Sequence, residues 1–364
     1  MEISNALRKT ANRITRSSLR KIPLPLWQKL FPKDVISLCY HMVSDENLPH
    51  FQLYPSKNVA QFEADIEFCK DRTISYEYLL AKRRLETSIP SNRFLFTFDD
   101  GFAQCFDVVR PILKRHAVDG VFFITTNFID DRELFGECLA SLCITRAGQM
   151  RDGQALSALE RINSTLLLGP AAEGRASAGP FDAFVLRGPG LPTPKRALMA
   201  AILGIDFSNK NAIESLCDLL QIDRNRDARD YAMFMTRQQI KTLSDEGFTV
   251  GAHGLDHQLL EYRTEREIEA EMVASCEVIR DITGKPSIPF AFPHSGINVR
   301  RSVLENILRR NPSIELIFDS GYLRRDRDFV VNRVFTDEPG EKRSTNLPAM
   351  LSASWTSPSA WYRS

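Results

Sequence analysis

The sequence lacks three features, each of which would assign a class of protein. Its 364 residues carry a formal net charge of +1 at pH 7, so no excess of basic residues indicates a nucleic-acid partner. No run of about 18 apolar residues occurs, and we therefore expect no membrane-spanning helix. The first residues also lack the uninterrupted apolar core of a secretory signal. We therefore expect a cytoplasmic protein.

Cysteine is scarce and scattered. The seven cysteines have no CxxC spacing, which argues against a structural zinc site built on thiolates. Their odd number and their positions inside apolar patterns favour reduced thiols over a disulfide framework. They are Cys39, Cys69, Cys105, Cys138, Cys143, Cys217 and Cys276.

Charge is distributed unevenly in the N-terminal segment 1–35. Its first 33 residues hold eight Lys or Arg against a single acid, Glu2. A basic amphipathic segment binds anionic membrane surfaces, so one interpretation is peripheral contact with the inner face of a membrane. The other interpretation is a solvated tail.

Strand-like and helix-like segments alternate over residues 36–126 and again over 236–335. Short aromatic and β-branched runs predict the strands. Capping boxes at Thr236–Gln239 and Thr264–Glu267 predict helices that begin there. Such alternation is typical of a parallel sheet, open or closed into a barrel. The expected strands are Ile36–Tyr40, Arg93–Phe98, Val121–Thr125, Phe248–Ala252, Ile288–Phe292, Ile314–Phe318 and Phe329–Val331.

Residues 127–235 interrupt this alternation. They contain two helix-like pieces, Leu156–Leu168 and Ala212–Leu220, and between these Gly169–Pro194 holds five Gly and five Pro. A structureless loop of that length is uncommon inside a compact domain. We interpret 127–235 as a partly helical insertion, which is either a lid or a tolerated surface excursion. Residues 336–364 are expected to form a C-terminal tail.

The first motif with chemical potential is Thr97-Phe98-Asp99-Asp100-Gly101. Two adjacent carboxylates directly after an apolar strand are costly unless they are solvated or bound. Neighbouring side chains point different ways at a strand end, so one Asp can ligate a metal while the other faces a substrate as a base. The alternative is a strand-ending turn with Asp as a helix N-cap.

The second motif is His253-Gly254-Leu255-Asp256-His257, which follows another expected strand. Two His four residues apart can converge on one metal, and zinc also accepts a carboxylate oxygen. The alternative is two surface His in a loop. The chain has only six His, and two of them fall at one strand end, which favours the metal interpretation.

Together these motifs resemble the NodB-type polysaccharide deacetylases, also called carbohydrate esterase family four. The resemblance extends to Leu38–Ser44 as the opening strand, to Thr236–Gly251 before the histidines, and to Phe290–His294 as a third motif. It covers about 36–126 and 236–335.

The resemblance implies a deformed (β/α) barrel that binds one divalent metal ion, with zinc as the first choice. Asp100, His253 and His257 would be the metal ligands, and Asp99 the general base. Collapse of the tetrahedral intermediate, stabilised by the metal and a backbone N–H near His294, would release acetate.

The sequence departs from the family pattern at two places. The family's third motif carries an Arg that braces the catalytic Asp, but Ala291 stands there; Arg333 is the candidate substitute. The family also supplies a late His as general acid, and no His follows His294. We therefore assign His294 as the acid, and expect Pro293, His41 and Arg333 to line the substrate pocket.

The function implied is removal of acetyl groups from an N-acetylated sugar of a polysaccharide, oligosaccharide or lipid-linked glycan. The missing Arg and late His leave two alternatives open: a non-catalytic carbohydrate-binding protein of the same fold, and an O-acetyl esterase, whose better leaving group needs an acid less.

Overall fold

Seven parallel strands close into a barrel in the computed structural model, which describes residues 23–30, 32–165, 193–207, 209–338 and 344–355. The strands follow one another around the barrel in sequence order, and β7 pairs with β1 to close it. The predicted (β/α) barrel is confirmed. The strands are β1 (Val35–Tyr40), β2 (Arg93–Phe98), β3 (Gly120–Ile124), β4 (Thr249–Ala252), β5 (Ile288–Ala291), β6 (Ile314–Asp319) and β7 (Val330–Phe335).

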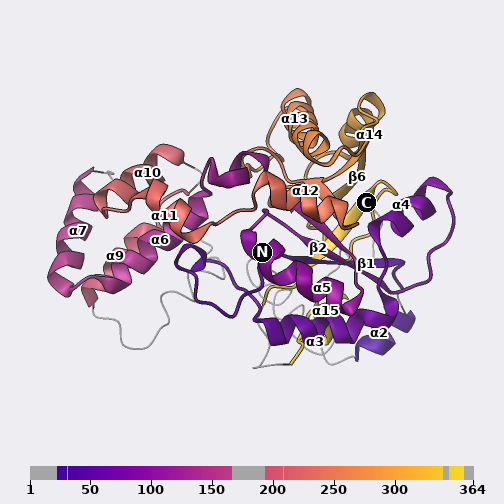
Figure 1. Cartoon of the computed structure of the whole chain (residues 1–364), viewed down its shortest axis with the longest axis horizontal. Helices are drawn as coiled ribbons and strands as arrows, with labels where there is room; N and C mark the ends of the chain where they lie inside the picture. The colour runs from indigo at the N-terminus through magenta and orange to yellow at the C-terminus, as the bar shows by residue number, and fades with distance from the viewer. Residues whose placement is uncertain (1–22, 31, 166–192, 208, 339–343, 356–364) are drawn as a thin grey trace, which may run out of the picture. The chain divides into compact units, whose positions relative to one another are not determined.

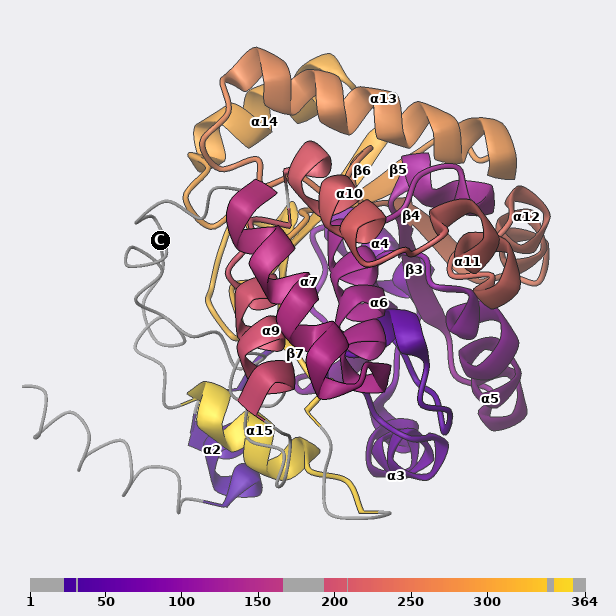
Figure 2. The same ribbon diagram turned by 90° about the vertical axis from the view of Figure 1, so that its left-hand side faces the viewer.

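Helices between the strands cover the barrel, and the two capping boxes form as predicted. Thr236 and Thr264 each accept a hydrogen bond from the backbone three residues on, where α12 and α13 begin. In Figures 1 and 2, α13 and α14 lie side by side along one flank of the barrel. The helical elements are α3 (Val59–Cys69), η2 (Lys70–Arg72), α4 (Tyr76–Arg84), the π-helical turn η3 (Cys105–Val109), α5 (Arg110–His116), η4 (Thr126–Asp131), α12 (Arg237–Asp245), α13 (Glu265–Thr283) and α14 (Arg301–Arg310).

The barrel interior is filled by large apolar side chains from alternate strand positions. Val121 and Phe123 of β3 pack there with Phe318 of β6, and all three are buried. Burying one such side chain stabilises the fold by about 1.5–3 kcal/mol. A Cβ at Gly251 would lie 2.5 Å from the Phe123 ring, so β4 needs a glycine at this point. Because both faces of the strands are covered, they are continuous apolar runs rather than alternating ones.

A second compact unit consists of residues 45–55 and 130–235. It is helical, and Figure 1 shows α6, α7, α9 and α10 gathered into one bundle. Its core is apolar and includes the thiols of Cys143 and Cys217, whose sulfur atoms lie 3.8 Å apart. The predicted Gly- and Pro-rich centre of the insertion, apart from its last two residues, lies outside the described residues. The elements are η1 (Pro49–Phe51), α6 (Gly136–Gln149), α7 (Asp152–Thr165), α9 (Thr193–Leu203), α10 (Lys210–Leu219) and α11 (Arg224–Tyr231).

The two ends of the described chain form helices that pack together, α2 (Leu24–Leu30) and α15 (Leu347–Trp355). The segment predicted as a C-terminal tail is anchored before α15 by a buried polar network. Lys57 forms an ion pair with Asp65, and both side chains are fully buried. Asn346 accepts a hydrogen bond from Lys57 at 3.0 Å, and Thr345 donates one to Asp65. Residues 1–22, with most of the basic charge, lie outside the described residues.

No described helix is long and apolar enough to cross a membrane.

Candidate active site

The carboxyl ends of the strands bring most of the predicted site residues together. Asp99 and Asp100 follow β2, and His253 and His257 follow β4. His41 follows β1 and His294 follows β5. Parallel barrels carry their chemistry at this end, because every strand ends at the same rim.

Three ligand-type side chains converge on one point. The Asp100 Oδ1 atom lies 3.4 Å from His253 Nε2 and 3.2 Å from His257 Nε2. All three residues are buried. Their ligand atoms all lie within 4.8 Å of one another.

The hydrogen bonding of this group fits a metal ion. Apart from the two imidazoles, the carboxylate oxygens of Asp100 have no hydrogen-bond partner among the described residues. His253 Nδ1 lies 3.0 Å from the Ala291 carbonyl oxygen. Since a carbonyl only accepts, Nδ1 carries the proton and Nε2 presents its lone pair to Asp100. Two lone pairs facing each other repel unless a cation lies between them, so this donor set suits a divalent ion.

Backbone strain gathers at the same rim. Asp100, His257 and His294 all have positive φ angles, of 72°, 55° and 55°. Residues other than glycine adopt this region at a cost of about 1–3 kcal/mol, so surrounding contacts must hold it. Gly101, with φ of 86°, allows the chain to turn after the carboxylates.

The histidine loop is held by contacts from two sides. Glu271 of α13 accepts a hydrogen bond from the Leu255 backbone at 2.6 Å. The Gly254 carbonyl accepts one from the Thr126 backbone at 3.0 Å. The carboxylate of Asp256 is bonded to the Asn127 amide. Asp256 therefore fastens the loop and does not join the ligand group.

Asp99 lies next to the ligand group and is paired with Arg333. The Arg333 guanidinium donates to Asp99 Oδ1 at 2.5 Å, and both side chains are buried. The Cys39 thiol donates to Oδ2 at 3.4 Å, and His253 Nε2 lies 3.6 Å from it. Burial opposes ionisation of Asp99, but the Arg333 charge outweighs it and lowers the pKa of this carboxyl. Asp99 is therefore ionised and able to accept a proton.

A second group of ligand-type atoms comprises Cys39, His41 and Asp99. Burial raises the pKa of the Cys39 thiol well above its usual range, so the thiol stays protonated. The Arg333 cation is already bonded to Asp99. Both facts disfavour a cation here, so the group of Asp100, His253 and His257 is the better candidate metal site.

His41 and Asp337 form a dyad at the rim. His41 Nδ1 lies 2.5 Å from Asp337 Oδ2, and the His41 backbone donates to the other carboxylate oxygen at 3.0 Å. Burial alone would lower the pKa of His41, but the Asp337 charge and hydrogen bond raise it to about 9. His41 therefore carries a proton at neutral pH. Asp337 was not predictable from the sequence, because a lone Asp after a strand has no distinguishing pattern.

His294 has the opposite electrostatic character. Its ring centroid lies 4.5 Å from that of His257. His294 has an exposed surface, but desolvation of its ring and the neighbouring His257 lower its pKa to about 3. The imidazole is therefore neutral at physiological pH. Pro293 lies beside it, with its ring carbons close to Gly254.

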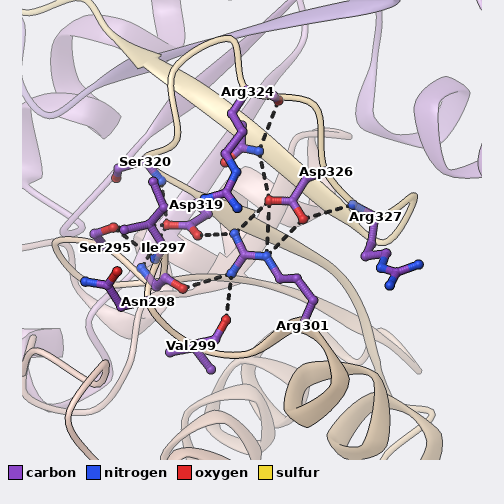
Figure 3. Close-up of polar contacts among 12 residues, drawn as sticks. Ser295, Ile297, Asn298, Val299, Arg301, Asp319, Ser320, Arg324, Asp326 and Arg327 are labelled. Atoms are coloured by element: carbon purple, nitrogen blue, oxygen red, sulfur yellow. Dashed lines mark hydrogen bonds and ion pairs between the residues drawn. The ribbon is translucent and has the colours of Figure 1, made fainter. Parts of the chain in front are cut away.

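An arginine-centred cluster holds the loops that carry His294. Figure 3 shows the Arg301 guanidinium between two carboxylates, Asp319 at 2.9 Å and Asp326 at 2.7 Å. Arg301 also donates to the Gly296 carbonyl at 2.8 Å. Ser320, next to Asp319, donates to the His294 carbonyl at 2.7 Å. The segments after β5 and β6 are thereby fixed to each other and to α14.

A family model described as polysaccharide deacetylase matches residues 213–308. The resemblance to the polysaccharide deacetylases is confirmed. The matched segment contains His253, His257 and His294 but ends before Arg333 and begins after Asp99. It supports a hydrolase that acts on amide bonds and removes acetyl groups from a polysaccharide.

Several solved structures are similar to the chain at low sequence identity. The deacetylase PplD of Streptococcus pyogenes, solved with acetate, has 13% identity and a TM-score of 0.48, covering 89% of this chain and 98% of its own. IcaB from Ammonifex degensii has 16% identity and a TM-score of 0.46, covering 88% and 96%. The polysaccharide deacetylase BC0361 from Bacillus cereus has 15% identity and a TM-score of 0.46, covering 90% and 70%. No curated protein shows a significant sequence match.

Proposed function

We propose that this deacetylase is metal-dependent and hydrolyses the acetamide of an N-acetylated sugar in a polysaccharide, oligosaccharide or lipid-linked glycan. The observation that carries the proposal is the pair of adjacent carboxylates with different partners. Asp100 faces two imidazoles and no other hydrogen-bond donor among the described residues. Asp99 faces an arginine and remains ionised. This difference in partners suits Asp100 as a metal ligand and Asp99 as the general base.

Asp100, His253 and His257 would hold the ion, for which zinc is our first choice among the divalent metals that such a set accepts. When bound, the ion supplies Lewis acidity, which lowers the pKa of water and polarises the acetyl carbonyl.

Asp99 acts as the general base in this proposal. Its carboxylate takes one proton from the attacking water, whose oxygen forms the new bond to the acetyl carbon. Arg333 holds Asp99 in place through Oδ1, which leaves Oδ2 on the side of His253. Arg333 thus fills the bracing role that Ala291 cannot, from β7 instead of β5.

We assign the general acid to His41 rather than to His294. Breaking the C–N bond requires a proton on the leaving nitrogen, because an amide anion is a very poor leaving group. His41 is protonated at neutral pH and oriented by Asp337, whereas His294 is neutral. The proton passes from His41 to the sugar nitrogen as the bond to carbon breaks. Acetate and the free amine leave.

The test combines metal content with acetate release. The protein is purified with zinc, and metal per chain is measured by mass spectrometry for wild type, His253→Ala and His116→Ala. His116 is a partly buried histidine of α5 near Glu63, outside the ligand group, and serves as the matched control. We expect about one ion per chain in wild type and His116→Ala, and none in His253→Ala.

Acetate release from an N-acetylglucosamine tetramer is then measured for wild type and Asp99→Asn. Loss of a general base lowers the rate about 10²–10⁴-fold, while the variant retains its metal and its fold. A wild type that binds metal and the tetramer but releases no acetate would indicate the non-catalytic alternative. Release from O-acetylated sugar alone would indicate the esterase.

A further inference from the structure

Three rings form a line from the reactive centre to the surface of the barrel rim. The His41 ring lies parallel to the Phe335 ring, with centroids 5.8 Å apart and an interplanar angle of 4°. Phe335, the last residue of β7, contacts Tyr322 edge to face at 6.4 Å. Exposure increases along the line, from 13% for the His41 side chain to 45% for Tyr322.

Tyr322 is held outward by a rigid turn. Its φ of 54° is unusual for an aromatic residue, and such strain persists only where neighbouring contacts enforce it. The preceding Gly321 approaches β7 so closely that a Cβ there would lie 2.0 Å from the Asn332 side chain. Asn332 also donates to the Arg324 carbonyl at 3.2 Å. The turn is therefore pinned on both sides of Tyr322.

The arginine cluster of Figure 3 anchors the base of the same loop. Asp319 precedes the turn and Asp326 follows it, and both carboxylates bind Arg301. Asn332 donates to Asp326 at 3.2 Å. The Arg301 guanidinium thus joins the two ends of the loop that carries Tyr322. These contacts fix the conformation of the loop, and a fixed loop lowers the entropic cost of binding a ligand.

We propose that Tyr322 and Phe335 form a stacking subsite for a pyranose ring of the glycan, one unit away from the sugar that is deacetylated. This proposal rests on the proposed function and extends it from an isolated N-acetyl sugar to a chain of sugars. The apolar C–H face of a pyranose packs on the electron-rich face of an aromatic ring, and its hydroxyls remain in water. A phenol at the rim, with an apolar body and a polar tip, matches that pattern.

The surroundings of Tyr322 favour a sugar over an acyl chain. A lipid-binding surface requires a contiguous apolar patch. Here the neighbours along the loop are Ser320, the partly buried Arg324 and the exposed Arg325. One exposed ring in a polar surrounding suits a ligand that is itself polar at its edges and apolar on its face.

The experiment tests whether substitution of Tyr322 lowers activity on a sugar chain more than activity on a small ester that has no sugar. Acetate release is followed for an N-acetylglucosamine tetramer and for 4-nitrophenyl acetate, which has no sugar. The variants are Tyr322→Ala, Tyr322→Phe and the control Tyr78→Ala, an exposed tyrosine of α4.

We expect Tyr322→Ala to raise KM for the tetramer about five- to ten-fold, with kcat nearly unchanged, because one aromatic stacking contact is lost. The ratio of tetramer to ester activity falls by the same factor. Tyr322→Phe keeps the ring and stays within two-fold of wild type. Equal losses on both substrates would indicate a merely structural role and overturn the subsite, as would an unchanged tetramer KM in Tyr322→Ala.

Calorimetric binding of the tetramer separates this proposal from the proposed function. A wild type that binds the tetramer without turnover, and whose affinity drops in Tyr322→Ala, retains the subsite while the enzymatic proposal fails. Full turnover of the tetramer by wild type and by Tyr322→Ala, with equal KM, supports the enzymatic proposal and overturns the subsite. A wild type that neither binds nor hydrolyses the tetramer overturns the subsite.

Discussion

The barrel unit and the helical unit bury different kinds of side chain. Among the described residues, every buried Asp, Lys and Arg lies in the barrel unit. The buried polar side chains of the helical unit are His50 and Ser141, within an otherwise apolar core. Removing a charge from water costs several kcal/mol, and pairing offsets only part of this.

The difference separates side chains that stabilise the fold from side chains that the proposed reaction requires. The core of the helical unit is stabilised by apolar packing, without a buried Asp, Lys or Arg among the described residues. The barrel keeps Asp99, Asp100 and Arg333 buried at one rim, where the desolvation of their charges opposes folding, so their presence calls for a functional explanation. Substitutions in the two units should therefore differ in their effects on stability, activity and metal content.

The largest effect is expected for Arg333→Met. Removing the guanidinium leaves the Asp99 carboxylate buried without its cation, which costs about 3–5 kcal/mol of unfolding free energy. Acetate release should fall as well, because Asp99 loses its fixed orientation. Urea unfolding at pH 7 and kcat measure the two effects. Arg333→Lys, which keeps the charge but not the fork of donors, should be intermediate. Unchanged stability and rate in Arg333→Met would remove the basis for the bracing role.

A substitution that creates a cavity in the core of the helical unit should lower stability without changing the metal content. Leu216 of α10 is fully buried, and Leu216→Ala should lower the free energy of unfolding by about 2–5 kcal/mol. The control is Leu156→Ala on α7, whose side chain is half-exposed; it should cost much less. Metal content should equal that of wild type in both variants. Loss of metal in Leu216→Ala would contradict the separation of the two units.

The smallest expected effect is on the pH dependence of stability, to which two histidines contribute with opposite signs. His50 is buried in the helical unit, and neither ring nitrogen has a hydrogen-bond partner among the described residues. Burial lowers the pKa of His50 from 6.5 to about 4. The stability it supports is present above pH 6.5 and lost as the pH falls through about 4, because the unfolded chain binds the proton more readily. His41 has a pKa raised to about 9, so its contribution is present below pH 6.5 and lost as the pH rises through 9.

Urea unfolding from pH 4 to pH 10 measures these contributions in wild type, His50→Phe and His41→Gln. His50→Phe should reduce the acid loss, by an amount on the order of 2 kcal/mol. His41→Gln should reduce the alkaline loss. If either variant follows the wild-type curve throughout, the corresponding histidine does not titrate on unfolding.

The local elements were predictable because their signals lie within a few residues. The Arg93–Phe98 run is β2 residue for residue, and both capping boxes begin helices where predicted. The strand β7 was predicted as three residues but spans six and includes Arg333. The missed helices α6 and α15 have weak amphipathic patterns, because neighbouring elements bury them on several sides.

The sequence by itself determined the strand-end motifs, and with them the type of chemistry. An apolar run followed by two carboxylates, and another followed by paired histidines, indicate a metal and a base wherever the strands lie side by side. Only the tertiary structure decided their partners. Arg333 is 234 residues from Asp99, and Asp337 is 296 residues from His41. These pairs meet because β7 closes the barrel against β1, and no local pattern encodes which strands a closed sheet makes neighbours.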